Sequence, residues 1–371
     1  MIKYNVYIII EENERMNTKI SEEKIKKVDK QISHKTDKVV MPGRAYFVIL
    51  TVTVILLLSF LVAFFAVFAN QSSTNNVEDD IPPQTDTVQP LPNYISKRSA
   101  NVFTVDTEIR SNNAILVELG SNESIAEKDA DERIYPASMT KVMSLLIVCE
   151  RAKNLNTKLK VTKDVADYAA RMDGSGYLSG KKNLNDELTI KDLLYLTSYY
   201  SDTIAIIMLA NYVAGSEAAF VRLMNNKAKA LGLENTNFAN CTGLHDENNY
   251  STCREIAAIM AYALDNPLCE KLLTSTEVYK IKTNSNDYTL WMPSWYGEDR
   301  FEQKTRLETV TVKGGKTGYI EESGICLVSY AESNSTSKRY IQVIVGRPKG
   351  SGLTAPASTE EVKFIYNEYA E

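Results

Sequence analysis

The most prominent feature in the pattern of hydrophobic and polar positions is an apolar run near the N-terminus. Residues 46–68 are 23 residues without a charged side chain, enough for a helix across the hydrocarbon core of a bilayer. The segment before the run carries ten Lys or Arg against seven Asp or Glu, and three acidic residues follow it from position 78. Because positive flanks tend to stay in the cytoplasm, the pattern predicts a transmembrane anchor over residues 46–69 and a cytoplasmic polar tail over residues 1–45.

The end of this apolar run leaves a second interpretation open, a signal peptide cleaved after Ala69. The run is long for a signal-peptide core, so an uncleaved anchor is favoured. Residues 70–100 are rich in Asn, Ser, Thr, Asp and Pro, a composition typical of a disordered extracytoplasmic linker. A coil of about 30 residues spans roughly 30 Å, which would hold a following domain away from the membrane.

From residue 101 to residue 371 the pattern alternates as it does in a folded domain. A β-rich run over Ala114–Leu119 predicts a first strand. Helical periodicity then predicts four helical stretches: the segment after Pro136, Leu184–Met208 with an interruption near Tyr199–Ser201, Gly215–Ala230, and Tyr250–Leu264 with Thr252 as its cap.

The last part of the chain switches back to strand patterns. Strands are predicted over residues 310–318, 325–331 and 340–346, before a closing helix over Thr359–Tyr369 with Thr359 as its cap. Because strands precede and follow the helices, the first and last strands are expected to meet in one sheet packed against helices. The fold class is therefore α/β (α+β).

Composition narrows the chemistry without identifying it. The net charge of −5 shows no strong bias toward nucleic acid, and 44% hydrophobic residues is ordinary for a globular core. The only histidines are His34 and His245, and the chain has no His-Glu-x-x-His sequence, which argues against a His-based zinc peptidase. The five cysteines form no Cys-x-x-Cys pair and are interpreted mainly as small buried side chains. A disulfide between Cys241 and Cys253 stays open.

The segment Tyr135–Lys141 carries the first candidate chemistry. Ser138 and Lys141 are three residues apart and share one face of a helix. A serine hydroxyl becomes a strong nucleophile when a neighbouring base takes its proton, and a buried lysine can be that base. Free backbone N–H groups at the start of a helix also point toward negative charge that forms on a substrate.

Two further short motifs follow in the chain. Ser201-Asp202-Thr203 lies in the interrupted helical stretch, and Lys316-Thr317-Gly318 lies on a β-rich segment. Each motif alone is a weak signal. Their combination with Ser138-x-x-Lys141, in this order and on these elements, is far more specific.

This arrangement resembles the serine penicillin-recognising enzymes, and among them the serine-type D-alanyl-D-alanine carboxypeptidases, the low-molecular-mass penicillin-binding proteins. The resemblance covers about residues 110–347. It extends beyond the motifs to Arg133–Lys141, Gly174–Leu178, Leu188–Leu194, Val213–Leu233, Asn235–His245 and Val312–Val328. It implies a β-lactamase/transpeptidase-like fold, with an antiparallel sheet of N- and C-terminal strands flanked by helices and a mostly helical subdomain.

The resemblance implies a role for each matched residue. Ser138 would be the acylated nucleophile, Lys141 its general base, and Ser201 the relay of a proton to the leaving D-alanine. For substrate binding it implies Lys316 and Thr317 as partners of the substrate carboxylate, Lys316 as the ammonium that keeps Lys141 partly neutral, Gly318 as a point of close backbone approach, and the N–H groups of Ser138 and Tyr319 as an oxyanion hole.

One position departs from the family pattern. The second motif usually ends in asparagine, and here it ends in Thr203. An asparagine amide can donate to the substrate and accept from the lysine, whereas threonine has one shorter hydroxyl. Thr203 is therefore kept as a substrate-binding candidate whose effect on the rate is undecided.

The sequence thus predicts a membrane-tethered carboxypeptidase that removes the terminal D-alanine from peptidoglycan stem pentapeptides. It would be a single-pass membrane protein with its catalytic domain outside the cell. β-Lactams would inhibit it, no metal or organic cofactor is implied, and nucleic acid is not a partner. Two alternatives stay open: a class A-like β-lactamase, although no Glu-x-x-x-Asn loop is evident after Thr203, and a catalytically impaired wall-binding or β-lactam-sensing module.

Overall fold

The structure is a computed structural model, and it describes residues 91–105, 109–172, 176, 178, 183–291, 306–347 and 355–371. The predicted cytoplasmic tail, the predicted transmembrane anchor and most of the predicted linker lie outside the described residues. Within the described part of the chain, no single helix combines the length and the apolar composition that a membrane crossing requires.

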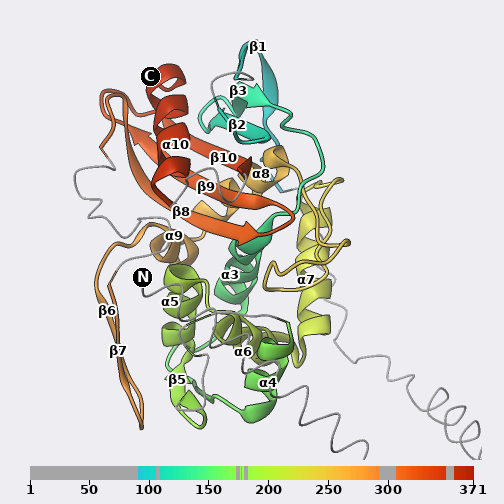
Figure 1. The fold of residues 1–371 in the computed structure, drawn as a ribbon, viewed down its shortest axis with the longest axis vertical. Coiled ribbons are helices and arrows are strands. Elements are labelled where there is room, and N and C mark those ends of the chain that lie inside the picture. Colours follow the sequence, from blue (N-terminus) through green and yellow to red (C-terminus); the bar gives the residue numbers. More distant parts are fainter. Residues whose placement is uncertain are drawn as a thin grey trace, which may run out of the picture. The chain divides into compact units, whose positions relative to one another are not determined.

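A six-stranded sheet forms the upper part of the folded unit, with strand order β1-β3-β2-β10-β9-β8 (Figure 1). Its strands are β1 (Lys97–Thr104), β2 (Asn113–Glu118), β3 (Glu123–Lys128), β8 (Val310–Ile320), β9 (Gly324–Ser333) and β10 (Arg339–Arg347). The N-terminal strand β2 pairs with the C-terminal strand β10, from Asn113 opposite Val345 to Glu118 opposite Tyr340. The prediction that first and last strands meet in one sheet is confirmed.

The edge strand β1 corrects two predictions. It pairs parallel to β3, whereas the other neighbours in the sheet are antiparallel, so the sheet is mixed and not antiparallel throughout. It also begins at Lys97, and Tyr94 and Ile95 before it pack against the core. The folded part therefore starts before residue 101. The sequence did not predict this, because the residues around Tyr94 and Ile95 are mostly polar.

Most helices lie below the sheet and form the helical subdomain (Figure 1). The helices are η1 (Ala137–Met139, a 3-10 turn), α3 (Thr140–Arg151), α4 (Lys163–Arg171), α5 (Ile190–Tyr200), α6 (Thr203–Ala214), α7 (Glu217–Ala230), α8 (Cys253–Leu264), α9 (Pro267–Thr274) and α10 (Ala355–Tyr369). Two small two-stranded sheets, β4 (Lys158–Lys160) with β5 (Glu187–Thr189) and β6 (Tyr279–Lys282) with β7 (Asp287–Leu290), complete the subdomain. Helices α6 and α7 reach the length and apolar composition of a membrane span only when taken together, and the pair is bent by 82°.

Alternate residues of β10 separate the two hydrophobic cores. Ile341 and Val343 belong to the larger core with the subdomain helices, including α8. Tyr340 and Ile344 belong to the smaller core on the other face, which α10 covers with Ile365 and other side chains. This alternation is the period of two expected of a sheet buried on both faces.

The ends of three predicted helices can be compared with the structure. Thr252 accepts a hydrogen bond from the backbone N–H of Glu255 at 3.1 Å, which confirms it as the cap of α8. The break predicted near Tyr199–Ser201 is confirmed between α5 and α6. Helix α10 begins at Ala355, so the prediction of Thr359 as its cap is wrong; Pro356 fits the first turn of a helix, where its missing N–H is no loss.

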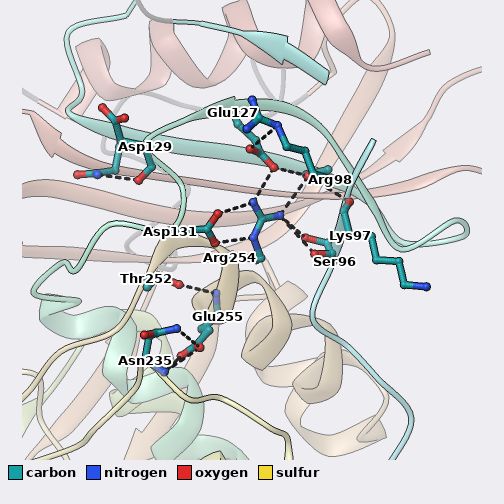
Figure 2. Close-up of polar contacts among 12 residues, drawn as sticks. Ser96, Lys97, Arg98, Glu127, Asp129, Asp131, Asn235, Thr252, Arg254 and Glu255 are labelled. Carbon is teal, nitrogen blue, oxygen red and sulfur yellow. Dashed lines mark hydrogen bonds and ion pairs between the residues drawn. The ribbon is translucent and has the colours of Figure 1, made fainter. Parts of the chain in front are cut away.

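A buried ion cluster around Arg254 of α8 fixes the chain before the nucleophile segment (Figure 2). The Arg254 guanidinium contacts the Glu127 carboxylate at 2.7 Å and the Asp131 carboxylate at 2.6 Å, and the Arg254 backbone N–H donates to Ala130 O at 3.1 Å. Arg254 and Glu127 are buried, and a buried charge is costly without a partner. The cluster therefore holds residues 127–131, which lead toward Ser138.

All five cysteines are free thiols, and Cys241, Cys253, Cys269 and Cys326 are buried. The disulfide that the sequence left open between Cys241 and Cys253 is not formed. Burial raises the pKa of the Cys253 thiol well above its usual value, which keeps it protonated and unreactive. These cysteines therefore serve as small core residues, as interpreted from the sequence.

Candidate active site

The nucleophile segment turns sharply before it enters α3. Ala137 is fully buried and has a left-handed φ of 47°, an uncommon conformation for a residue with a side chain. This turn is followed by Ser138 in η1 and by Lys141 in the first turn of α3. The Nζ of Lys141 lies 3.1 Å from the Oγ of Ser138. The structure therefore has Ser138 and Lys141 side by side, as the spacing predicts.

The second motif occupies the junction between α5 and α6. Ser201 ends α5 in a left-handed conformation with φ of 56°, and Asp202 caps α6 by accepting from Ala205 N at 2.8 Å. Asp202 also accepts from Leu178 N at 2.8 Å, so its carboxylate binds the neighbouring segment to the junction. The junction turns the Ser201 hydroxyl toward β8, where Lys316 donates to its Oγ at 3.0 Å.

The third motif lies on β8, the strand at the edge of the sheet. Lys316 is fully buried, and its Nζ donates to Ser201 Oγ and, at 2.8 Å, to Thr317 O. A Cβ on Gly318 would lie 3.0 Å from both Ala137 Cβ and Ser138 N. Glycine at this position therefore lets β8 lie directly against the nucleophile segment.

Burial changes the protonation of both lysines. It lowers the pKa of Lys141 from its usual 10.5 to about 8, against the opposing influence of Cys241 and Asp202. The pKa of Lys316 is lowered well below its usual value, first by burial and then by the neighbouring charge of Lys141. Because two neighbouring positive charges repel each other, Lys141 and Lys316 are not both protonated easily. One amine is readily neutral while the other carries the proton. Burial is the main cause at Lys141, where repulsion by Lys316 had been expected.

A backbone group that sequence reasoning missed completes the environment of Lys141. The Lys141 Nζ donates to the carbonyl oxygen of Thr242 at 2.5 Å. Thr242 lies in the loop before α8. This loop packs directly against the segment that carries Ser138: a Cβ on Gly243 would lie 1.9 Å from Ala137 O. A backbone carbonyl has no signal of its own in a sequence; turn-forming Asn240 and Gly243 were the available indication.

The remaining candidates lie at or near this cluster. Thr203 is buried at the start of α6, and within the described part of the chain no hydrogen bond joins it to Lys141. Thr317 is half-buried, whereas Tyr319 is exposed on β8. His245 packs edge-on against Tyr135. Among the described residues, no group of His, Cys, Asp and Glu could hold a metal ion.

The side chains of Ser138, Lys141, Ser201 and Lys316 converge here from η1, α3, the α5–α6 junction and β8. Two hydroxyls, each in contact with a buried amine, are the arrangement expected of a serine peptidase. Comparison with known proteins gives the family. Residues 99–349 match the Peptidase S11 family model, described as D-alanyl-D-alanine carboxypeptidase, and the chain belongs to this family.

Relatives agree with this assignment, and a solved structure shares the fold. The D-alanyl-D-alanine carboxypeptidase DacF of Bacillus subtilis is 30% identical over 256 residues, which are 69% of this chain and 62% of DacF. The chain thus spans less than two thirds of that relative. A D-alanyl-D-alanine endopeptidase of Escherichia coli is 29% identical over 245 residues, 64% of this chain and 72% of that protein. The crystal structure of a Streptomyces DD-transpeptidase, 24% identical, shares the fold with a TM-score of 0.59 over 70% of this chain and 96% of its own.

With Lys141 as the general base, its lowered pKa predicts an acylation rate that depends on pH. Only the neutral amine can take a proton, and the amine is neutral above a pKa of about 8. The rate constant for labelling by a fluorescent penicillin is therefore expected to rise about tenfold per pH unit below that value and to level off above it. Stopped-flow labelling from pH 5 to pH 10 measures this profile; a rate independent of pH across this range would exclude Lys141 as the base.

Proposed function

We propose that this protein is a serine-type D-alanyl-D-alanine carboxypeptidase that removes the terminal D-alanine from peptidoglycan stem pentapeptides. The observation that carries the proposal is the convergence of Ser138, Lys141, Ser201 and Lys316, with Lys141 3.1 Å from Ser138 and Lys316 3.0 Å from Ser201. Membership of the family supports peptide substrates of this kind and acylation by β-lactams.

In the acylation step, neutral Lys141 takes the proton of Ser138 while Oγ attacks the carbonyl between the two D-alanines. Substrate carboxylate beside Lys316 and Thr317 favours the ammonium form of Lys316, and this charge in turn favours the neutral form of Lys141. The N–H groups of Ser138 and Tyr319 would stabilise the oxyanion, a contribution of about 3 kcal/mol per donor in other acyl-transfer enzymes.

Collapse of the tetrahedral intermediate breaks the peptide bond. The leaving D-alanine amine takes a proton from Ser201, which Lys316 replaces through its hydrogen bond to Ser201 Oγ. Lys141 then gives up the proton that it took from Ser138 to the neutral Lys316 amine, so Lys141 is neutral again. Water then attacks the ester on Ser138 while neutral Lys141 takes one of its protons, and Lys141 passes this proton to Oγ, which leaves as a hydroxyl. The product is a tetrapeptide that can no longer donate its terminal bond to a crosslink.

We further propose that the protein is anchored in the cell membrane by residues 46–69, with its catalytic domain on the extracytoplasmic face. The apolar run, its positive N-terminal flank and the polar stretch after residue 70 support this location. The substrate class supports it as well, because peptidoglycan lies outside the membrane.

The test is D-alanine release by the full-length protein from a D-Ala-D-Ala-ended pentapeptide, compared with Ser138→Ala. We expect release by the wild type and a loss of at least about 10³-fold in the variant. Ser216→Ala, which changes the exposed cap of α7 outside the three motifs, is the matched control and should retain activity. Hydrolysis of crosslinked dimers without D-alanine release would indicate an endopeptidase, and rapid turnover of penicillin would indicate a β-lactamase.

A further inference from the structure

The segment Asn240–Leu244 forms a tight turn that is organised by one buried side chain. Asn240 is 5% exposed, and its Oδ1 accepts from Thr242 N at 3.1 Å, Thr242 Oγ1 at 2.9 Å and Gly243 N at 2.7 Å. Its Nδ2 donates to Leu244 O at 3.0 Å. A single amide therefore binds backbone groups of Thr242, Gly243 and Leu244.

This turn is held firmly against the nucleophile segment. Gly243 has a left-handed φ of 79° and lies so close to Ala137 that a Cβ would be 1.9 Å from its carbonyl oxygen. Ser144 of α3 donates to Cys241 O at 2.8 Å, and Glu217 accepts from Cys241 N at 3.0 Å. The position of the Thr242 carbonyl is thus set from both sides of the turn.

The Thr242 carbonyl constrains the direction of the Lys141 amine. A neutral amine has two N–H groups and one lone pair, and a carbonyl can only accept, so the contact of 2.5 Å takes one N–H. With that N–H fixed, the lone pair can be directed at Ser138 Oγ, 3.1 Å away. After proton transfer, the same neutral carbonyl accepts from the ammonium without the strong rise in pKa that a carboxylate would cause.

The departure at Thr203 makes this contact more important. An asparagine there would offer an amide oxygen to the lysine, whereas in the described part of the chain the hydrogen bonds of Lys141 Nζ run to Ser138 and Thr242. The Thr242 carbonyl is therefore the acceptor left to orient the amine.

We propose that Asn240 is a positioning residue for the general base: through the turn 240–244 it holds the Thr242 carbonyl that orients Lys141 toward Ser138. The inference rests on the proposed function, because it concerns acylation of Ser138. It assigns to Asn240 an effect on the rate of proton abstraction and not only on stability.

Two variants and a matched control test this role. Asn240→Ala removes the acceptor, whereas Asn240→Asp keeps an acceptor for the same three donors and adds a negative charge near Lys141. Asn225→Ala is the control, because Asn225 binds Phe238 N and Phe238 O, just before the turn, at 2.8 and 2.9 Å and contacts neither Thr242 nor Lys141. The measured quantity is the rate constant for fluorescent penicillin labelling of the full-length proteins from pH 5 to pH 10, with circular dichroism to confirm folding.

We expect Asn240→Ala to lower the plateau rate by about 10- to 100-fold, the usual cost of a misplaced catalytic group. Asn240→Asp should recover the plateau to within about threefold of wild type, while its midpoint moves to higher pH because the new carboxylate stabilises the ammonium. Asn225→Ala should keep both the plateau and the midpoint.

The inference is overturned if labelled wild type and Asn240→Ala have the same plateau, or if Asn225→Ala loses as much as Asn240→Ala. A profile of Asn240→Asp that stays as low as that of Asn240→Ala, with an unmoved midpoint, also overturns it. A wild-type protein that no β-lactam labels would contradict the proposed function itself, so the two failures are distinguishable.

Discussion

Replacement of Lys141 with methionine is expected to slow acylation of Ser138 by about 10²- to 10⁴-fold, the usual contribution of a general base. Methionine has nearly the length of lysine and fills the same buried space, but it has no lone pair to take the proton from Ser138 Oγ, 3.1 Å from the lysine Nζ. The measurement is the second-order rate constant for fluorescent penicillin labelling at pH 8. A loss smaller than about tenfold would show that another group supplies the base.

The same variant should be more stable than the wild type at pH 7, which separates lost chemistry from lost folding. The pKa of Lys141 is lowered from 10.5 to about 8 in the folded protein, so below pH 8 the fold holds a buried charge that the unfolded chain solvates. That shift corresponds to about 3 kcal/mol, and the lost hydrogen bond to Thr242 O offsets part of it, so we expect a net gain of about 1–3 kcal/mol.

The stability difference between the wild type and Lys141→Met should itself depend on pH. Between pH 8 and pH 10.5 the folded protein releases the Lys141 proton while the unfolded chain still binds it, so the stability of the wild type rises through this window relative to the variant. The gain from Lys141→Met should therefore shrink as pH rises. Denaturant unfolding at pH 7 and pH 10 measures it; Lys163→Met, which removes an exposed lysine paired with Asp167, should show no such gain.

Replacement of Gly243 with alanine is the second change for which we expect a large loss, of about 100-fold in the acylation rate. The new Cβ would lie 1.9 Å from Ala137 O and 3.0 Å from Ser138 N, and these backbone atoms cannot rotate away as a side chain could. Either the nucleophile segment or the Thr242 carbonyl must shift. Labelling kinetics and thermal unfolding, measured together, report the effect on the site and on the fold.

Gly215→Ala is the matched control for this variant. Gly215 has the same φ of 79°, but a Cβ there would meet nothing within 4 Å. Both variants therefore carry the strain of a left-handed alanine, while only Gly243→Ala adds the collision with the nucleophile segment. Equal effects of the two substitutions on acylation would show that strain alone is responsible and that the close contact at Ala137 is not needed for catalysis.

The elements that the sequence predicted well are those with a clear hydrophobic period. The strands β9 and β10 and the helices α7 and α8 bury apolar faces, so their residues repeat at the spacing of their structure. Strand β1 was missed because its residues Lys97–Thr104 are mostly exposed and polar, and its parallel pairing with β3 has no local signal. An exposed polar edge strand of this kind has no hydrophobic period from which it could be predicted.

In the site, the important side chains could be predicted from the sequence, whereas the backbone groups could not. Ser138 and Lys141 could be predicted because a spacing of three places them on one helical face, and Lys316 because its motif follows them on a strand. The Thr242 carbonyl could not be predicted, since every residue has a carbonyl and only the fold brings this one to Lys141. The left-handed φ of Ala137 was likewise invisible, because alanine is not a residue type that marks such a turn.

The most direct test of the central claim is mass spectrometry of the full-length protein after brief treatment with benzylpenicillin. Trypsin cleaves after Arg133 and after Lys141, so it should release residues 134–141, which contain Ser138. We expect one penicilloyl adduct, on this peptide, with fragment ions that place it on Ser138. An adduct on another residue, or an unmodified protein under conditions that label a known penicillin-binding protein, would contradict the account.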